Sequence, residues 1–284
     1  MTAKIIDGRK IADKTRRSIS NEVGLLKEKY RKTPNITTIK IGDNPESNLY
    51  LKLRDDACKD VGIVPNLLSF PDHISEEEVV ESILRLNENR NVHGVLIQLP
   101  IPTHLSIDEM IDVLDPKKDV EGLTPYNMGS TLSGNEKIVP CTPLAVLTIL
   151  EEEKVNLQGK NVVIVNHSNI VGKPLAALFL NRNATTTVTH VFTKDLASFT
   201  SKADILVSAA GVPKLIKAGH VKKDAFVLDV GIVKTSSGVC GDVDFDAVKE
   251  KAGVITPVPG GVGPVTVACS IHNMVKTFKY CLED

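Results

Sequence analysis

The chain has 284 residues, which is enough for about two domains of ordinary size. Its 34 lysine and arginine residues nearly balance its 35 aspartate and glutamate residues, so the formal net charge is −1. This balance argues against a nucleic-acid partner bound by bulk positive charge and against an acidic disordered chain. No apolar run approaches the roughly 20 residues that span a bilayer, and the N-terminal segment lacks the apolar core of a signal peptide. A cytoplasmic globular protein without a membrane partner is therefore expected.

Cysteine and histidine residues are scattered along the chain. The five cysteines are odd in number and form no C-x-x-C pair, so buried free thiols are expected rather than disulfides or a zinc site. The seven histidines include no H-E-x-x-H motif. The sequence therefore predicts no metal site.

The first half of the chain alternates between helical and strand patterns. Two segments, Ser75-x-x-Glu78 and Ser106-x-x-Glu109, have the capping-box pattern that opens helices. An unbroken apolar run over 92–100 is typical of a strand that is covered on both faces. The other expected elements are a helix over 9–30, a strand over 36–42, a helix over roughly 46–61 and a strand over 66–70.

A second series of elements begins after residue 140. The expected helices are 143–154, 172–182 and 265–281, and the expected strands are 160–166, 185–192, 204–210 and 225–232. Strands that alternate with helices predict an α/β fold with a mostly parallel sheet in each half. The order of the second half is typical of a doubly wound, Rossmann-like nucleotide-binding domain.

The turn after the first strand of this second half is a candidate phosphate site. Residues 166–174 keep only Gly172 of a G-x-G-x-x-G pattern, so an ordinary polar turn stays open as an alternative. A helix N-terminus offers free N–H groups to a phosphate. Ser168 adds a hydroxyl there, and His167 and Lys173 add positive charge.

The end of the next strand favours NADP over NAD. Enzymes that use NAD usually place an acidic residue there, which accepts a hydrogen bond from the ribose 2′-hydroxyl. This chain has Thr193 and Lys194, whose hydroxyl and ammonium groups suit a 2′-phosphate better. Asp195 follows directly, so NAD remains an alternative.

Other candidate residues are less specific on their own. The segment 256–266, TPVPGGVGPVT, joins stiff prolines to permissive glycines just before a helix, which favours a ligand-contacting loop. Tyr50 and Arg54 lie four residues apart, so they project from one face of a helix. Gln98 interrupts an apolar run, where its side chain needs a partner.

Together these segments resemble the bifunctional methylenetetrahydrofolate dehydrogenase/cyclohydrolase family. The resemblance implies oxidation of 5,10-methylenetetrahydrofolate with hydride transfer to NADP, and then hydrolysis of the methenyl product to 10-formyltetrahydrofolate in one-carbon metabolism. It also implies a homodimer whose subunits have two lobes: a folate lobe of 1–140 completed by 265–284, and an NADP lobe of 141–264. The matching motifs, in order, are IGDNPESNLYLKLRDDACKDVGI, GVLIQLPIP, KDVEGLTPYN, PCTP, SNIVGKP, DVGI and TPVPGGVGPVT.

The resemblance also assigns roles to individual residues. Tyr50 matches the tyrosine that lies along the folate ring, and Gln98 matches the glutamine that hydrogen-bonds to the catalytic base. The implied catalytic residues are Tyr50, Arg54, Gln98 and Glu121; the other implied folate contacts are Leu99, Pro100, Pro259, Gly260, Gly261, Val262 and Gly263; and the implied coenzyme contacts are Asn166, His167, Ser168, Thr193, Lys194 and Ile232.

The chain departs from the family pattern at three places. Arg54 replaces the catalytic lysine, Glu121 replaces the aspartate that grips the pterin, and Asn166-His167-Ser168 replaces a Gly-Arg/Ala-Ser turn. Arginine stays protonated and is a poor general base, whereas hydride transfer mainly needs two molecules to be positioned. We therefore expect dehydrogenase activity to be kept and cyclohydrolase activity to be weak or lost. The alternatives are an amino-acid-type or shikimate-type dehydrogenase, and a catalytically inactive folate or nucleotide sensor.

Overall fold

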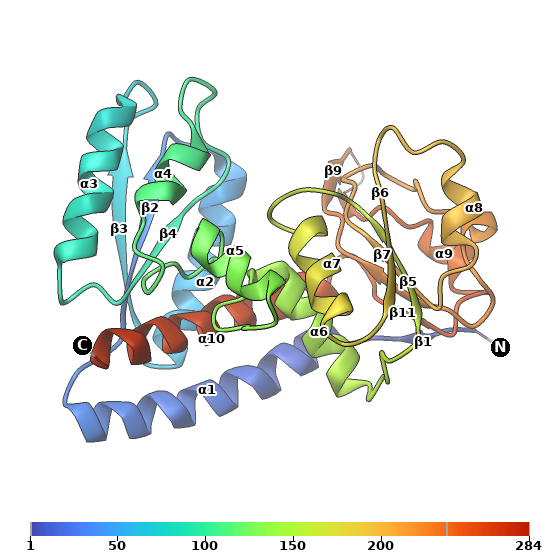
Figure 1. Cartoon of the computed structure of the whole chain (residues 1–284), viewed down its shortest axis with the longest axis horizontal. Coiled ribbons are helices and arrows are strands. Elements are labelled where there is room, and N and C mark those ends of the chain that lie inside the picture. Colours follow the sequence, from blue (N-terminus) through green and yellow to red (C-terminus); the bar gives the residue numbers. More distant parts are fainter. Residues whose placement is uncertain (1, 237, 284) are drawn as a thin grey trace. The chain divides into compact units, whose positions relative to one another are not determined.

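The computed structural model describes residues 2–236 and 238–283, except for the side chains of Pro45, Glu46, Ser47, Leu49 and Tyr50. The chain forms two compact units. Unit 1 comprises residues 1–13, 131–135 and 140–266, and unit 2 comprises 14–130, 136–139 and 267–284. Parallel sheets with covering helices occur in both, so the predicted α/β fold class is confirmed (Figure 1). The predicted domain boundaries stay a prediction.

Unit 2 is built on a three-stranded parallel sheet in the order β3-β2-β4. Pro65 is tolerated in β3 because this strand lies at the edge of the sheet and needs fewer hydrogen-bond donors. The strand predicted over 92–100 is shorter in the structure, because its ladder with the central strand ends at Ile97 and Pro100 has no N–H to extend it. The bounds are β2 (Asn35–Ile41), β3 (Val64–Phe70) and β4 (Gly94–Ile97).

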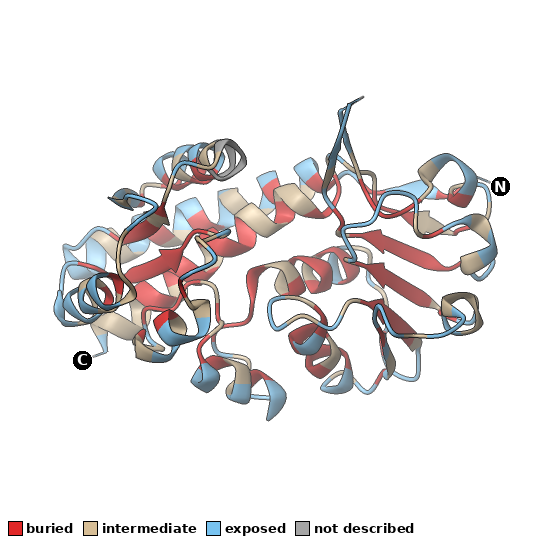
Figure 2. Ribbon diagram, turned by 90° about the horizontal axis from the view of Figure 1, so that it is seen from above, coloured by how far each residue is buried: buried red, intermediate tan, exposed pale blue. Residues whose placement is uncertain are grey.

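Helices cover both faces of this sheet, because successive side chains of a strand point to opposite sides. One core joins Ile36 and Leu96 to α1, α2 and α10, and the other joins Ile39 and Ile97 to α3 and α4. Figure 2 shows the buried strands between exposed helix faces. The helices that lie wholly or mostly in this unit are α1 (Gly8–Tyr30), α2 (Pro45–Asp60), α3 (Glu76–Glu88), α4 (Ile107–Val113), α5 (Pro125–Leu132) and α10 (Val262–Leu282).

The two predicted capping boxes have different outcomes. At Ser75 the box is complete, because the Ser75 hydroxyl accepts from the Glu78 N–H and the Glu78 carboxylate accepts from the Ser75 N–H. At Ser106 the hydroxyl accepts from the Glu109 N–H over 3.3 Å. The reciprocal bond predicted there is wrong: the Ser106 N–H donates to Glu76 Oε2, at 2.5 Å, on the neighbouring helix α3.

Unit 1 is built on a six-stranded parallel sheet in the order β1-β11-β8-β7-β5-β6. The chain runs from β5 to β6 on one side and then to β7 on the other, which makes a topological switch point. The short strands β1 and β11 were not predicted, because two residues each are too few for a periodic pattern. The bounds are β1 (Lys4–Ile5), β5 (Asn161–Val165), β6 (Thr185–Thr189), β7 (Ile205–Ser208), β8 (Phe226–Asp229) and β11 (Val254–Ile255).

Short helices and a hairpin complete unit 1. Its core gathers apolar side chains of β5, β7, β8 and β11, including Val163, Leu206 and Val227. The closing helix α10 begins at Val262, three residues earlier than predicted, so Val262 and Gly263 lie in its first turn rather than in a loop. The remaining elements are α6 (Cys141–Glu152), α7 (Gly172–Leu180), α8 (Leu196–Thr200), the 3₁₀ turn η1 (Ala218–His220), β9 (Val233–Thr235), β10 (Gly238–Cys240) and α9 (Phe245–Val248).

Candidate functional site

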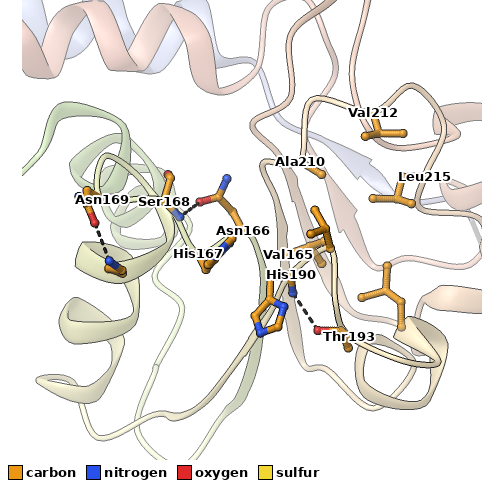
Figure 3. Close-up of a pocket in the computed structure, with 13 residues that line it drawn as sticks. Val165, Asn166, His167, Ser168, Asn169, His190, Thr193, Ala210, Val212 and Leu215 are labelled. Carbon is orange, nitrogen blue, oxygen red and sulfur yellow. Dashed lines mark hydrogen bonds between the residues drawn. The ribbon is translucent and has the colours of Figure 1, made fainter. Parts of the chain in front are cut away.

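A cavity of about 690 Å³ lies at the carboxyl ends of β5, β6 and β7 in unit 1 (Figure 3). This is the place at which open α/β sheets bind ligands, next to the switch point. Its basic side chains are His167, His190 and Lys173, and no aspartate or glutamate belongs to the described lining. The full lining is Val165, Asn166, His167, Ser168, Asn169, Lys173, His190, Val191, Thr193, Leu196, Ala210, Val212 and Leu215.

The side chain of Asn166 builds the turn that follows β5. Its Oδ1 accepts from the N–H groups of Ser168 at 2.7 Å and Gly172 at 3.1 Å, and its Nδ2 donates to the carbonyl of Ala209 at 2.7 Å. The Asn166–Ser168 bond is drawn in Figure 3. An amide side chain thus holds a turn for which the usual fingerprint relies on glycines.

Gly172 is required where this turn meets helix α7. A Cβ at Gly172 would lie 2.2 Å from the backbone oxygen of Asn166, so only glycine fits without a shift of the backbone. The expectation of free N–H groups at the start of α7 is wrong for two of them: Gly172 N–H bonds to Asn166 Oδ1, and Lys173 N–H bonds to the Ser168 carbonyl. Anion binding by the side chains of His167, Ser168 and Lys173 stays a prediction.

Thr193 belongs to a closed turn at the end of β6. The Thr193 hydroxyl accepts from the His190 N–H at 2.9 Å, and the Thr193 N–H donates back to the His190 carbonyl at 2.9 Å. The Asp195 carboxylate does not line the cavity; it caps helix α8 by accepting from the Ser198 N–H. Lys194 is exposed beside this turn and is likewise outside the lining.

Two buried carboxylates position the loops that follow β7 and β8. Asp242 accepts from the Ser208 hydroxyl at 2.8 Å and from the N–H groups of Ala210 at 2.6 Å and Val212 at 2.9 Å. Asp229 accepts from the N–H groups of Gly231, Asp242 and Val243. Burial raises the pKa of Asp229 to about 6, against the effect of these backbone bonds. Since Ala210 and Val212 line the cavity, Asp242 fixes part of its wall.

Ile232 follows the Asp229 loop but does not join the cavity. Its side chain is 67% exposed, and the residue lies between β8 and the β9–β10 hairpin. Of the predicted coenzyme contacts, the cavity therefore gathers Asn166, His167, Ser168 and Thr193, and it leaves Lys194 and Ile232 outside.

Arg54 is fully buried in unit 2. It lies on α2, its exposed fraction is 0%, and its Nη2 donates to the Thr38 hydroxyl on β2 over 2.6 Å. Asp55 Oδ1 lies 3.7 Å from the same nitrogen. Within the described part of the chain, Arg54 Nε and Nη1 have no hydrogen-bond partner. Because a guanidinium stays charged in proteins, Nε and Nη1 are strong hydrogen-bond donors that could bind an acceptor of a ligand.

Gln98 lies on the same face of the sheet as Thr38. Thr38 pairs with Leu96 in the parallel ladder, and Gln98 is two residues further along that strand direction. The Gln98 Nε2 donates to the Leu99 carbonyl at 2.9 Å, whereas its buried Oε1 has no described partner. The Arg54 guanidinium and the Gln98 Oε1 thus belong to the same face of the sheet. Pro100 follows as an exposed residue.

The half-buried Glu121 stands in a loop that Asp119 holds from within. The buried Asp119 carboxylate accepts from the N–H groups of Gly122 and Thr124, each at 2.8 Å, and from Asn127 Nδ2 at 2.9 Å. Asp119 also bridges to Val95 of β4. The loop that carries Glu121 is therefore held in place by hydrogen bonds to Asp119.

The proline- and glycine-rich loop is compact within unit 1. The Gly8 N–H donates to the Gly260 carbonyl at 3.0 Å, and a Cβ at Gly8 would lie 1.8 Å from the Gly261 oxygen. Gly260 has a φ of 103°, which favours glycine. Pro259 is exposed in the same turn. The glycines therefore serve close backbone packing, and a role in substrate contact stays a prediction.

Sequence comparison covers almost the whole chain. The family model of the tetrahydrofolate dehydrogenase/cyclohydrolase catalytic domain matches residues 6–121, and that of the NAD(P)-binding domain matches residues 140–282. The chain belongs to the tetrahydrofolate dehydrogenase/cyclohydrolase family. The predicted resemblance is thus confirmed. A curated relative, the bifunctional protein FolD of Methanosarcina barkeri, is 52% identical over 273 residues, which cover 96% of this chain and 95% of the relative.

Solved structures agree with this family. The bifunctional FolD enzyme of Campylobacter jejuni has a TM-score of 0.96 and 39% identity, covering 98% of this chain and 99% of that one. The FolD of Trypanosoma brucei, solved with NADP and an inhibitor, has a TM-score of 0.95 and 35% identity, and all of both chains is covered. A shikimate dehydrogenase of Aquifex aeolicus, at 12% identity and a TM-score of 0.53, shares only the fold. The shikimate-type alternative is therefore not favoured.

The cavity of this family member fits an anionic dinucleotide. Its lining offers three basic side chains and two hydroxyls, and no described carboxylate faces it. The Asn166 side chain holds the turn in place, and Gly172 allows two backbone segments to pack closely. In the usual fingerprint, glycines serve both purposes. NADP, which carries one more phosphate than NAD, suits this lining better.

Some predicted residues and classes of site need separate mention. The side chain of Tyr50 lies outside the described residues, although its backbone belongs to α2. Over residues 2–236 and 238–283, no helix is both long and apolar enough to cross a membrane. Across the same ranges, no group of three His, Cys, Asp or Glu side chains is placed to hold a metal ion. None of the five cysteines, all of which lie in the described ranges, forms a disulfide, and Cys58, Cys141 and Cys269 are buried.

Sequence reasoning missed one residue that lines the cavity and two that hold loops in place. His190 directly follows β6, so the rule that ligands meet strand ends could have found it. Asp242 acts through a bond to the backbone of Ala210, 32 residues earlier in the chain, so no local pattern marks it. Asp119 acts through bonds to the nearby backbone of Gly122 and Thr124.

Proposed function

We propose that this chain oxidises 5,10-methylenetetrahydrofolate to 5,10-methenyltetrahydrofolate with NADP, as part of one-carbon metabolism. The observation that carries the proposal is the acid-free, basic cavity at the carboxyl ends of β5, β6 and β7 in a chain of this family. NADP, when bound, supplies the hydride acceptor. The task of the protein is to bind and orient two molecules, which is the main requirement of hydride transfer.

The residues in the two units have distinct proposed tasks. In the cavity, Ser168, Lys173 and Thr193 would hold phosphate oxygens, and Val212 and Leu215 would exclude water. In unit 2, Arg54 and Gln98 would hydrogen-bond the folate, and Glu121 would grip the pterin amidine by charge-assisted bonds. Tyr50, Leu99, Pro100 and residues 259–263 stay predicted folate contacts.

We further propose that hydrolysis of the methenyl bridge is weak or absent. Addition of water needs a group that takes up and returns a proton. A buried lysine can lose its proton, because burial lowers a lysine pKa by up to several units, whereas arginine stays protonated. Arg54 is fully buried and its guanidinium bonds to Thr38, so it is held as a fixed charge rather than a proton shuttle.

The test compares the wild type with Arg54→Lys in both assays: NADPH formation from methylenetetrahydrofolate, and loss of methenyltetrahydrofolate absorbance. We expect hydrolysis to rise at least tenfold in the variant while dehydrogenation changes less. Lys52→Arg is the matched control, since Lys52 is exposed on the same helix. Wild-type hydrolysis at a rate comparable with NADP reduction would overturn the proposal, and so would equal rates in the wild type and Arg54→Lys.

The coenzyme and the sensor alternative are tested in the same dehydrogenase assay. NADP is expected to be preferred because Asp195 is occupied as a helix cap. A preference for NAD above tenfold would contradict this. No reduction of either coenzyme, with retained binding of folate, would favour the inactive sensor.

We also propose a cytoplasmic homodimer. Strand β6 is an edge of the six-stranded sheet, and the apolar Phe192 that follows it is 82% exposed. Exposed edges and apolar side chains of this kind are often covered by a partner. Sedimentation analysis at micromolar concentration and cell fractionation test the two parts. A monomer at every concentration would contradict the dimer, and enrichment in the membrane fraction would contradict the location.

A further inference from the structure

Two histidine rings lie next to each other in the lining of the coenzyme cavity. His167 lies in the turn after β5, and His190 directly follows β6. Their ring centroids are 5.0 Å apart with a tilt of 49°, and both rings line the cavity (Figure 3). Such a spacing leaves both imidazoles able to reach one polyatomic anion placed beside them.

His190 stands where dinucleotide-binding domains read the adenosine ribose. In NAD enzymes an acid about 20 residues after the phosphate turn, near the end of the second strand, binds the 2′-hydroxyl. In this chain that strand is β6, and the first side chain after it that lines the cavity is His190. The nearest following acid, Asp195, is committed to capping α8.

The backbone fixes which nitrogen of His190 can donate. The Phe192 N–H donates to His190 Nδ1 over 3.3 Å, so Nδ1 acts as an acceptor and the ring proton belongs on Nε2. The turn is closed by two further bonds of 2.9 Å between His190 and Thr193. His190 is thereby oriented with Nε2–H as a free donor for a ligand.

We propose that His190, paired with His167, selects a ribose phosphomonoester over an unmodified ribose. The inference deepens the proposed function, since it takes the cavity to be the coenzyme site. The Nε2–H of His190 donates to a phosphate oxygen, and the His167 ring contacts the same phosphate. Thr193 keeps its hydroxyl hydrogen for a further bond, because its oxygen only accepts from His190.

Binding of 2′,5′-ADP and 5′-ADP tests this without any folate chemistry. The two nucleotides differ only by the 2′-phosphate, and calorimetry gives each Kd. We expect the wild type to bind 2′,5′-ADP at least tenfold more tightly than 5′-ADP. His190→Ala should reduce that ratio to below threefold while the Kd for 5′-ADP changes less than twofold. His167→Ala should reduce the ratio in part.

The matched control is His73→Gln, an exposed histidine of unit 2, which should leave both affinities unchanged. Since His190 is exposed, its variants should keep the wild-type Tm. An unchanged ratio in His190→Ala, or an equal loss for both nucleotides, would overturn the inference and leave the proposed function standing. A wild type that binds neither nucleotide would overturn both.

Discussion

The buried carboxylate of Asp242 accepts a hydrogen bond from the hydroxyl of Ser208, 2.8 Å away at the end of β7. The same carboxylate accepts from the N–H groups of Ala210 and Val212, so all its described partners are donors that belong to one strand end and its loop. A carboxylate suits this place because it offers acceptors only. Asp242 therefore fixes one wall of the coenzyme cavity, although its own side chain does not line the cavity.

Replacing Asp242 by asparagine should weaken coenzyme binding and stability together. The new amide NH₂ group would face a backbone N–H, which leaves a buried donor unpaired at a cost of about 2 kcal/mol. We expect the KM for NADP to rise roughly tenfold and kcat to change less, because the loop loses its anchor. Steady-state kinetics and urea unfolding measure both effects. Asp244→Asn, a half-buried neighbour, is the control, and an unchanged KM beside lower stability would mean that Asp242 supports only the fold.

Gly172→Ala should disrupt the turn after β5. The added Cβ would meet the backbone oxygen of Asn166 at 2.2 Å and the Cα of His167 at 2.7 Å, and backbone atoms cannot rotate away. We expect NADP affinity to fall more than tenfold, with a loss of about 2 kcal/mol or more in the free energy of unfolding. Gly24→Ala is the matched control, because Gly24 has open space around it in the middle of α1. That change should stabilise the protein by about 0.5–1 kcal/mol. Wild-type NADP affinity in Gly172→Ala would refute the close-packing argument.

Lys118→Met should destabilise unit 2. Lys118 is buried, and its Nζ donates to the carbonyls of Leu86 at 2.8 Å, Asn87 at 2.6 Å and Asn89 at 2.9 Å at the end of α3. Burial lowers the Lys118 pKa, yet three acceptors still hold the ammonium. Methionine has a similar length and no donor, so the carbonyls lose a charged partner at a cost of about 3 kcal/mol.

Chemical denaturation checks the prediction for Lys118. Lys117→Met is the comparison variant, since the Lys117 side chain is exposed and its backbone stays in the same turn. Equal midpoints for Lys118→Met and the wild type would show that water replaces the ammonium at no cost.

His93 should make the stability of the protein depend on pH. Burial, with a smaller effect of Lys32 and Lys118, lowers the His93 pKa from 6.5 to about 4. Between these values the unfolded chain binds more protons than the native state, so stability rises with pH. The contribution is complete above pH 6.5 and is lost as the pH falls towards 4, with a total of about 3 kcal/mol.

The measurement is the free energy of unfolding at several pH values from 4.5 to 7. His93→Gln should flatten the slope, because glutamine does not titrate. The exposed His73→Gln should keep the slope of the wild type. A slope in His93→Gln equal to that of the wild type would assign the pH dependence to other groups.

Regular elements were predictable where one local pattern was sufficient. The run V-V-I-V at 162–165 gave a buried strand and its carboxyl end, and therefore the position of the phosphate turn. The capping box at Ser75 was predictable because both of its partners lie within one helical turn. Gln98 was expected to be buried because it interrupts an apolar run, and it is 8% exposed in the structure.

The remainder depends on contacts that local patterns do not encode. The Ser106 N–H donates to Glu76 on another helix. Lys118 donates to the carbonyl of Asn89 at the end of a helix that lies about 30 residues earlier in the chain. Asp242 reaches loop residues more than 30 positions before it. Asn166 replaces glycines by a side-chain clamp, so a search for the glycine pattern undervalues the turn.

The two-residue strand β1 has a consequence for biosynthesis. Lys4 and Ile5 pair with Val254 and Ile255, which the ribosome adds about 250 residues later. Strand β1 must therefore stay unpaired until residues 254 and 255 have been synthesised, since its partner strand does not exist before then. Contacts of such long sequence separation form slowly. Folding of the six-stranded sheet is thus expected to be completed only after residue 255 has left the ribosome, even if the rest of unit 1 has already formed.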